Sequence, residues 1–216
     1  MDKTVFISGS RQIRNLPAEA QDRLGNIIAQ ELEVILGDSD KGVDKMVADC
    51  LRKEAYSNVR IFSIHSSSRI KNLPEEWVFQ TVSTDTSKKF DKNGKITNGR
   101  ELETAKDRRM GELCDYGLVV WQATYVNHRF GNESVSSGSL RNMVQLLLSN
   151  KPVLLYYKKD CDDFVELDFD CCELRKIEEL QEVVKGLESE LVEKRYKRIL
   201  KDEERQRGEQ QQLGFD

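Results

Sequence analysis

The stretch Thr4-Val-Phe-Ile-Ser-Gly-Ser-Arg11 decides the fold of this chain, because it joins an apolar strand to a short turn of small residues. Residues 5–7 form a continuous apolar run, which is typical of a strand covered on both faces. The small side chains that follow leave their backbone amides uncovered, and a helix expected to begin near Pro17 would direct its dipole toward them. The turn therefore predicts an anion-binding site, with these ligand-binding residues: Ser8, Gly9, Ser10 and Arg11.

The composition limits the classes of partner. The chain has 216 residues, 34 Lys and Arg, 38 Asp and Glu, and a formal net charge of -4, so it offers no basic field for duplex nucleic acid. No apolar run approaches the roughly 18 residues of a membrane span. Five cysteines without a CxxC pair and only two histidines give no typical zinc pattern. We expect a cytoplasmic protein that binds no duplex nucleic acid, no membrane, no metal and no cofactor.

Apolar strands alternate with amphipathic helices along most of the chain. The predicted strands cover residues 4–7, 33–37, 58–64, 116–121 and 151–157, and the predicted helices cover residues 16–32, 45–55, 100–114 and 138–148. This alternation predicts an α/β fold, a Rossmann-like three-layer sandwich with a mostly parallel sheet of about five strands. Two long stretches, 65–99 and 122–137, lack clear periodicity, and their role is left open.

The composition changes after residue 158. We divide the chain into an α/β domain at 1–158, which is the part expected to bind the ligand, an acidic linker at 159–172 and a charged helical arm at 173–216. The arm carries one apolar seam at 3–4 spacing, formed by Ile177, Leu180, Val184, Leu187 and Leu191. A single helix would not leave this seam exposed, so it should pack on its own domain or on a second copy. We favour self-association into a homo-oligomer, because the acidic segment resembles a spacer.

Two further turns fall where predicted strands end. In an open parallel sheet, ligands bind outside the carboxyl ends of the strands, so these turns should lie beside the first one. The second turn is rich in Gly and Asp and could hold ribose hydroxyls, and Asp44 is expected to cap the helix after it. The third turn begins a helix and suits a phosphate. The predicted ligand-binding residues here are Gly37, Asp38, Ser39, Gly42, Asp44, Ser137, Gly138 and Ser139.

The helix predicted at 100–114 supplies charged candidates. Glu103 and Asp107 share one helical face, which either looks into the cleft or is simply solvated. We take Glu103, Asp107 and Glu133 as candidate catalytic carboxylates and Arg108 as a further ligand-binding residue.

Several of these motifs together resemble a known family. They stand in the order Gly9-Ser-Arg11, Gly37-Asp-Ser39, Gly42-Val-Asp44, Pro74-Glu-Glu-Trp77, Asp107-Arg-Arg-Met110, Cys114-Asp-Tyr-Gly-Leu-Val-Val-Trp121, Ser137-Gly-Ser139 and Lys151-Pro-Val153. Over residues 3–158 the chain resembles the SLOG superfamily, and within it the YspA-like group. The resemblance implies a Rossmann-like fold that binds nucleotides or ADP-ribose-type ligands. Some members cleave N-glycosidic bonds of nucleotides, and others are ligand sensors in bacterial stress and defence systems.

One departure from that family bears on activity. The phosphoribohydrolase branch has a Glu where this chain has Asn142, and an amide cannot serve as a general base. Another carboxylate would have to replace it, and the candidates are Asp38, Glu103, Asp107 and Glu133. We therefore predict a binding module for a nucleotide-derived small molecule. The alternatives are an enzyme that cleaves or transfers the N-glycosidic bond of a nucleotide, and a scaffold whose work is done by the arm.

Overall fold

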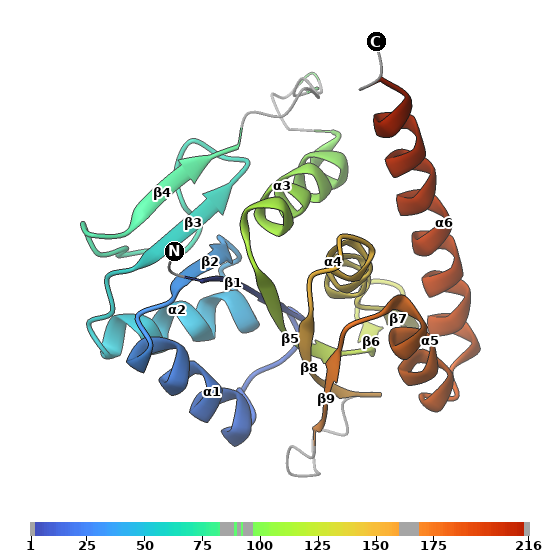
Figure 1. Ribbon diagram of the computed structural model, residues 1–216, viewed down its shortest axis with the longest axis horizontal. Coiled ribbons are helices and arrows are strands. Elements are labelled where there is room, and N and C mark those ends of the chain that lie inside the picture. The colour runs from blue at the N-terminus through green and yellow to red at the C-terminus, as the bar shows by residue number, and fades with distance from the viewer. Residues whose placement is uncertain (1–2, 83–88, 90–91, 93–96, 160–168, 214–216) are drawn as a thin grey trace.

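The computed structural model describes residues 3–82, 89, 92, 97–159 and 169–213 (Figure 1). A seven-stranded sheet in the order β4-β3-β2-β1-β5-β8-β9 forms its centre, and every neighbouring pair is parallel except β8 and β9. The strands are β1 Thr4–Gly9, β2 Glu33–Gly37, β3 Val59–Ser63, β4 Val78–Thr81, β5 Tyr116–Gln122, β8 Val153–Lys158 and β9 Asp170–Leu174. The predicted α/β three-layer fold with a mostly parallel sheet is confirmed, with two strands more than expected.

Helices cover both faces of the sheet (Figure 1). Alternate residues of β1 divide between two cores: Val5 and Ile7 pack in the same cluster as residues of the first two helices, and Phe6 packs with those of the later helices. Six helices are described: α1 Ala18–Ala29, α2 Val43–Lys53, α3 Gly99–Leu113, α4 Ser137–Leu148, α5 Ile177–Gly186 and α6 Glu190–Leu213. This arrangement buries residues 4–8 of β1 and brings its carboxyl end to the starts of α2 and α4.

The two irregular stretches contain structure that the sequence did not indicate. β4 lies in the first stretch and pairs with β3, and β6 Thr124–Asn127 and β7 Asn132–Val135 form a separate hairpin in the second. Trp77 anchors the first stretch, because its ring is buried and its Nε1 donates a 2.7 Å hydrogen bond to the Tyr56 carbonyl.

The C-terminal segment folds back onto its own domain. β9 completes the sheet beside β8, and Leu180, Val184 and Leu187 are buried in the same core as β5 and β8. The expectation that the arm reaches away from the domain is wrong. Residues 160–168 of the expected linker lie outside the described residues.

The expected seam also ends earlier than its spacing indicated. The chain turns at Glu188, where φ is 50°, so α5 and α6 are separate helices and the apolar face shifts. Leu191 is therefore 38% exposed, and α6 instead buries Val192, Tyr196 and Ile199. Association between copies stays a prediction. In the part of the chain that is described, no helix has the length and apolarity needed to cross a bilayer.

Candidate functional site

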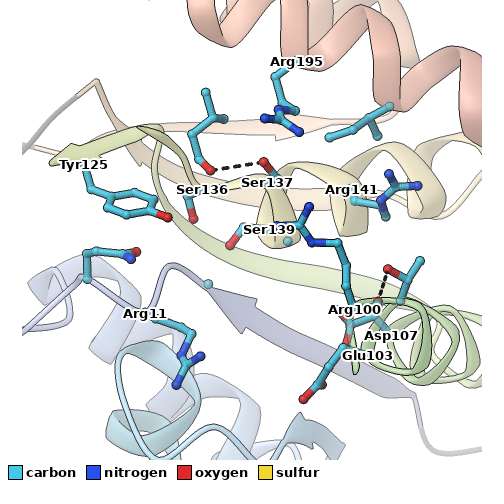
Figure 2. A pocket seen from close by; sticks show the side chains of 16 residues that line it. Arg11, Arg100, Glu103, Asp107, Tyr125, Ser136, Ser137, Ser139, Arg141 and Arg195 are labelled. Atoms are coloured by element: carbon cyan, nitrogen blue, oxygen red, sulfur yellow. Dashed lines mark hydrogen bonds between the residues drawn. The ribbon is translucent and has the colours of Figure 1, made fainter. Parts of the chain in front are cut away.

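Two adjoining cavities lie at the carboxyl ends of the central strands. We call the first the arginine cavity; it has a volume of about 310 Å³, and its arginines and turn residues are Arg11, Arg100, Arg141, Arg195, Ser137, Gly138 and Ser139 (Figure 2). We call the second the carboxylate cavity; it has a volume of about 220 Å³ and its charged residues are Asp44, Glu103, Asp107, Arg11, Arg69 and Lys106. The residues that line both cavities are Gly9, Arg11, Glu103, Asp107, Gly138 and Ser139. The two cavities therefore form one continuous site.

Close packing of two turns builds the floor of this site. A Cβ atom at Gly9 would lie 2.3 Å from Val43 Cγ2, so only glycine lets β1 approach α2 this closely. Gly42 has a φ of 68°, and a Cβ atom there would lie 2.4 Å from the Arg11 Cα. These two glycines bring the turns after β1 and β2 into contact, which places Arg11 at the cavities.

Ser10 has a structural role in the same turn. Its Oγ accepts a 3.0 Å hydrogen bond from the Gln122 backbone N–H and donates one of 3.1 Å to the Gln122 carbonyl. It also shares a 2.7 Å hydrogen bond with the Ser136 Oγ. Ser10 thus joins β1 to the end of β5 and to the start of α4, and it lines neither cavity.

The first turn of α4 is open toward the arginine cavity. The residue before the helix, Ser136, makes no side-chain hydrogen bond to this turn, and the Ser137 hydroxyl donates backward to the Val135 carbonyl at 3.1 Å. A Cβ atom at Gly138 would meet no atom within 4 Å. Because the first N–H groups of a helix lack partners within it, this turn can receive an anion.

Four arginines surround that turn, and only two of them have a carboxylate partner among the described residues. Arg11 contacts Asp40 at 3.5 Å in a solvent-exposed pair, and Arg141 pairs with Glu203 and lies 3.7 Å from Asp202. Among the described residues, neither Arg100 nor Arg195 has an ion-pair partner. Figure 2 shows both side chains extending from α3 and α6 toward the first turn of α4. Four arginines against two carboxylates give the arginine cavity excess positive charge.

An ion network supports the carboxylate cavity from below. Asp38 is fully buried, and it accepts hydrogen bonds from Arg69 Nη2 at 2.6 Å, Arg69 Nε at 3.1 Å and the Ser63 hydroxyl at 2.7 Å. Burial alone would raise the pKa of Asp38, but these hydrogen bonds outweigh it and hold the pKa below its usual value. Arg69 also contacts Glu103 at 3.0 Å. Asp38 therefore holds Arg69 in place at the cavity wall.

The pKa values of two carboxyls of this cavity, Asp44 and Asp107, are shifted in the opposite direction. Burial raises the pKa of Asp44 to about 6, although the nearby Lys106 opposes the shift. Burial also raises the pKa of Asp107, whose Oδ1 lies 3.4 Å from the Lys106 Nζ. The lysine is itself buried, which would lower its pKa, but Asp107 and Glu103 raise the pKa above its usual value and keep it charged. The cavity thus combines a fixed cation with Asp44, a carboxyl whose pKa of about 6 lets it exchange protons near neutral pH.

Three buried polar atoms in the carboxylate cavity lack partners. The Oγ atoms of Ser8 and Ser139 and the Oδ1 of Asn142 make no hydrogen bond to any described residue. Each of these side chains is at most 5% exposed. Leaving a buried polar group unpaired costs about 1–3 kcal/mol, so this arrangement favours a polar occupant.

The structure brings most of the predicted site residues together. Those that line one or both cavities are Ser8, Gly9, Arg11, Gly37, Ser39, Asp44, Glu103, Asp107, Ser137, Gly138 and Ser139. Asp38 and Gly42 support the cavities without lining them. Asp44 was expected to cap α2, but the helix begins at Val43, and Asp44 instead accepts a 3.4 Å hydrogen bond from the Ser39 N–H inside the carboxylate cavity.

Two predicted residues lie away from the cavities. Arg108 points to the opposite side of α3, where it binds Glu203 and Gln206, because residues 107 and 108 are a hundred degrees apart on a helix. Glu133 is an exposed residue of β7 and lines a neighbouring groove of about 1050 Å³ that also contacts Arg11 and Tyr125.

Sequence reasoning missed several cationic residues of the site: Arg69, Arg100, Lys106, Arg141 and Arg195. Lys106 stands between Glu103 and Asp107 in the chain, and this charge pattern could have indicated it. Arg69 belongs to a stretch without periodicity, and Arg195 belongs to the arm, so no local signal pointed to either. Among the described residues, no group of three His, Cys, Asp or Glu side chains could hold a metal ion.

Comparisons with known proteins give a distant structural likeness. No protein-family profile and no curated protein matches the chain. Among solved structures, the chain is similar to the molybdenum cofactor binding protein from the phototrophic bacterium Rippkaea orientalis, with a TM-score of 0.45 and 14% sequence identity. The similarity covers 74% of this chain and 78% of that one.

Proposed function

We propose that the protein binds a nucleotide-derived small molecule of the nucleotide, NAD or ADP-ribose type. The observation that carries this proposal is the pairing of the two cavities, one cationic and one lined by buried polar atoms without partners. Phosphate groups would occupy the arginine cavity, and the neutral, hydroxyl-rich part of the ligand would occupy the carboxylate cavity.

The chemistry of each cavity supports this orientation. The open first turn of α4 and the guanidinium groups are donors that match phosphate oxygens. Ribose hydroxyls both donate and accept, so they can pair with the Ser8 and Ser139 hydroxyls, the Asn142 carbonyl oxygen and the Asp44 carboxyl. The resemblance to the SLOG superfamily agrees with a ligand of this class, and a sensor role in bacterial stress or defence belongs to the same proposal.

A second candidate is cleavage of the N-glycosidic bond of the bound nucleotide. One observation favours it: Asp44, with a pKa of about 6, shares the cavity with Asp107 and Glu103. A protonated carboxyl could protonate the leaving base while a neighbouring carboxylate stabilises positive charge at the sugar. A water molecule would then add to the sugar C1′ and give up a proton to that carboxylate. We place it second because Asn142 carries no charge at the position where the related hydrolases have Glu.

The proposal is tested by mixing the purified protein with AMP, ADP, NAD and ADP-ribose. Thermal unfolding reports binding, and chromatography of the same samples reports released base. We expect at least one of these compounds to raise the unfolding temperature while no base is released. Release of free base would establish the enzyme instead. No thermal shift and no base release with all four compounds would refute both functions.

A further inference from the structure

The C-terminal helix α6 forms one wall of the arginine cavity. Arg195 and Ile199 line this cavity together with the first turn of α4. Figure 2 shows Arg195 extending from α6 to the side of Ser137. A residue nearly sixty positions after that turn in the chain thus faces the same space.

Arg195 differs from the lysines beside it on the helix. Lys194 pairs with Glu190 at 2.9 Å and Lys197 pairs with Glu193 at 2.6 Å, both along the exposed surface of α6. Arg195 is partly buried and has no ion-pair partner among the described residues. A guanidinium that loses part of its hydration without gaining a carboxylate favours an anion in the cavity.

α6 is also joined to α4 beneath the cavity. Glu203 of α6 is 2% exposed and accepts hydrogen bonds from Arg108 at 3.0 Å, from the Gln145 Nε2 at 3.1 Å and from Arg141. Arg141 lines the cavity as well, so it stands between α6 and any ligand. The helix therefore reaches the site twice, directly through Arg195 and indirectly through Arg141.

We propose that Arg195 is a ligand-binding residue that contacts the anionic group of the ligand, so that the bound ligand joins α6 to the first turn of α4. This inference rests on the proposed function and adds the C-terminal helix to the site. Because the anion would contact α6 only while the helix is docked, binding must stabilise the docked state. Occupancy of the cavity is thereby transmitted to the C-terminal helix.

The test uses the full chain with Arg195→Ala, Arg195→Lys and the control Arg198→Ala. Arg198 is an exposed arginine of the same helix, lines neither cavity and has no ion-pair partner among the described residues. Titration calorimetry with ADP and with ADP-ribose should show about tenfold weaker binding for Arg195→Ala, as expected for one lost charge-assisted hydrogen bond. Arg195→Lys should retain part of the affinity, and Arg198→Ala should match the wild type.

Hydrogen exchange provides the second readout. Amides of residues 192–209 should exchange more slowly in the wild type when ADP or ADP-ribose is present, and this protection should be smaller in Arg195→Ala. Equal affinity of Arg195→Ala and the wild type would remove Arg195 from the site while leaving the proposed function intact. Unchanged exchange in α6 of the liganded wild type would overturn the coupling. A wild type that binds none of AMP, ADP, NAD and ADP-ribose would refute this inference together with nucleotide binding.

Discussion

The two cavities share six lining residues, yet they differ in whether their charged side chains have ion-pair partners within the protein. In the arginine cavity, cations face open space, and two of the four arginines have no ion-pair partner among the described residues. In the carboxylate cavity, the charges are already paired: Arg69 binds Asp38 and Glu103, and Lys106 binds Glu103 and Asp107. One cavity is therefore prepared for an external anion, while the other pairs most of its charges within the protein and offers the ligand a neutral polar surface.

This difference has an energetic meaning. Exposed cations cost little to maintain and gain energy only when a ligand arrives. A buried ion network instead contributes to the fold, because removing one partner leaves another charge buried without compensation. Substitutions in the arginine cavity should thus affect binding, and substitutions in the carboxylate cavity should affect stability. The following four predictions test that separation.

The largest effect is expected for Arg69→Ala. The fully buried Asp38 would keep only the hydrogen bonds from the Ser63 hydroxyl and from the backbone N–H of residue 69, and the free energy of unfolding should fall by about 4 kcal/mol. The control is Arg109→Ala, which breaks a solvent-exposed pair with Glu112 and should cost less than about 1 kcal/mol. Urea unfolding measures both. If both variants lose less than about 1 kcal/mol of unfolding free energy, the ion network does not stabilise the fold.

That network also shows why the sequence did not predict Arg69 as a residue of the site. The glycine turns after β1 and β2 and the start of α4 were predicted, because each has a local pattern of small residues after an apolar strand. Arg69 reaches Asp38 across 31 positions, and its own stretch has no periodicity. Such partners are chosen by tertiary packing, which a local pattern does not encode.

Local sequence patterns also missed some elements of the fold. The five inner strands are continuous apolar runs and were placed correctly within a few residues. β4 and β9 are edge strands whose residues are mostly partly or fully exposed, so they lack the apolar run of a central strand. The break between α5 and α6 at Glu188 depends on a left-handed residue that is not glycine, which spacing alone does not indicate.

The second prediction concerns Gly138→Val, which should separate binding from folding. A Cβ atom here would meet no atom within 4 Å, so the free energy of unfolding should change by less than about 0.5 kcal/mol. The same side chain would fill the space where a phosphate approaches α4, and affinity for ADP should fall by about a hundredfold. Calorimetry measures the affinity.

Gly9→Val is the matched comparison for that variant. Its Cβ atom would lie 2.3 Å from Val43 Cγ2 and 2.4 Å from the Val120 carbonyl oxygen, so this variant should lose stability through overpacking. If Gly138→Val binds ADP normally, the anion site lies elsewhere.

The third prediction is that Arg11→Ala weakens binding of a phosphorylated ligand by about 2 kcal/mol, the range for a charge-assisted hydrogen bond. Stability should hardly change, because the pair with Asp40 is solvent-exposed at 3.5 Å. Arg14→Ala is the control, since Arg14 is exposed and lines neither cavity. Equal affinities of the two variants for ADP would show that Arg11 does not contact the bound ligand.

The smallest effect is expected for Asp44→Asn, and it depends on pH. The pKa of Asp44 is about 6 in the folded protein, against 3.8 as its ordinary value, because burial disfavours the charged form. Between these two values the folded state binds more protons than the unfolded state, so this carboxyl contributes less stability as the pH rises through about 6. Asn carries no charge and removes this dependence.

The difference in unfolding free energy between Asp44→Asn and the wild type should therefore move in favour of the variant by about 1 kcal/mol from pH 5 to pH 7.5. Urea unfolding of both proteins at the two pH values measures the change, and a difference that is independent of pH would show that Asp44 is fully ionised at pH 5. A shift of the expected sign would mean that the carboxylate cavity keeps one carboxyl at a cost to the fold, which is the property that a group reserved for a ligand should have.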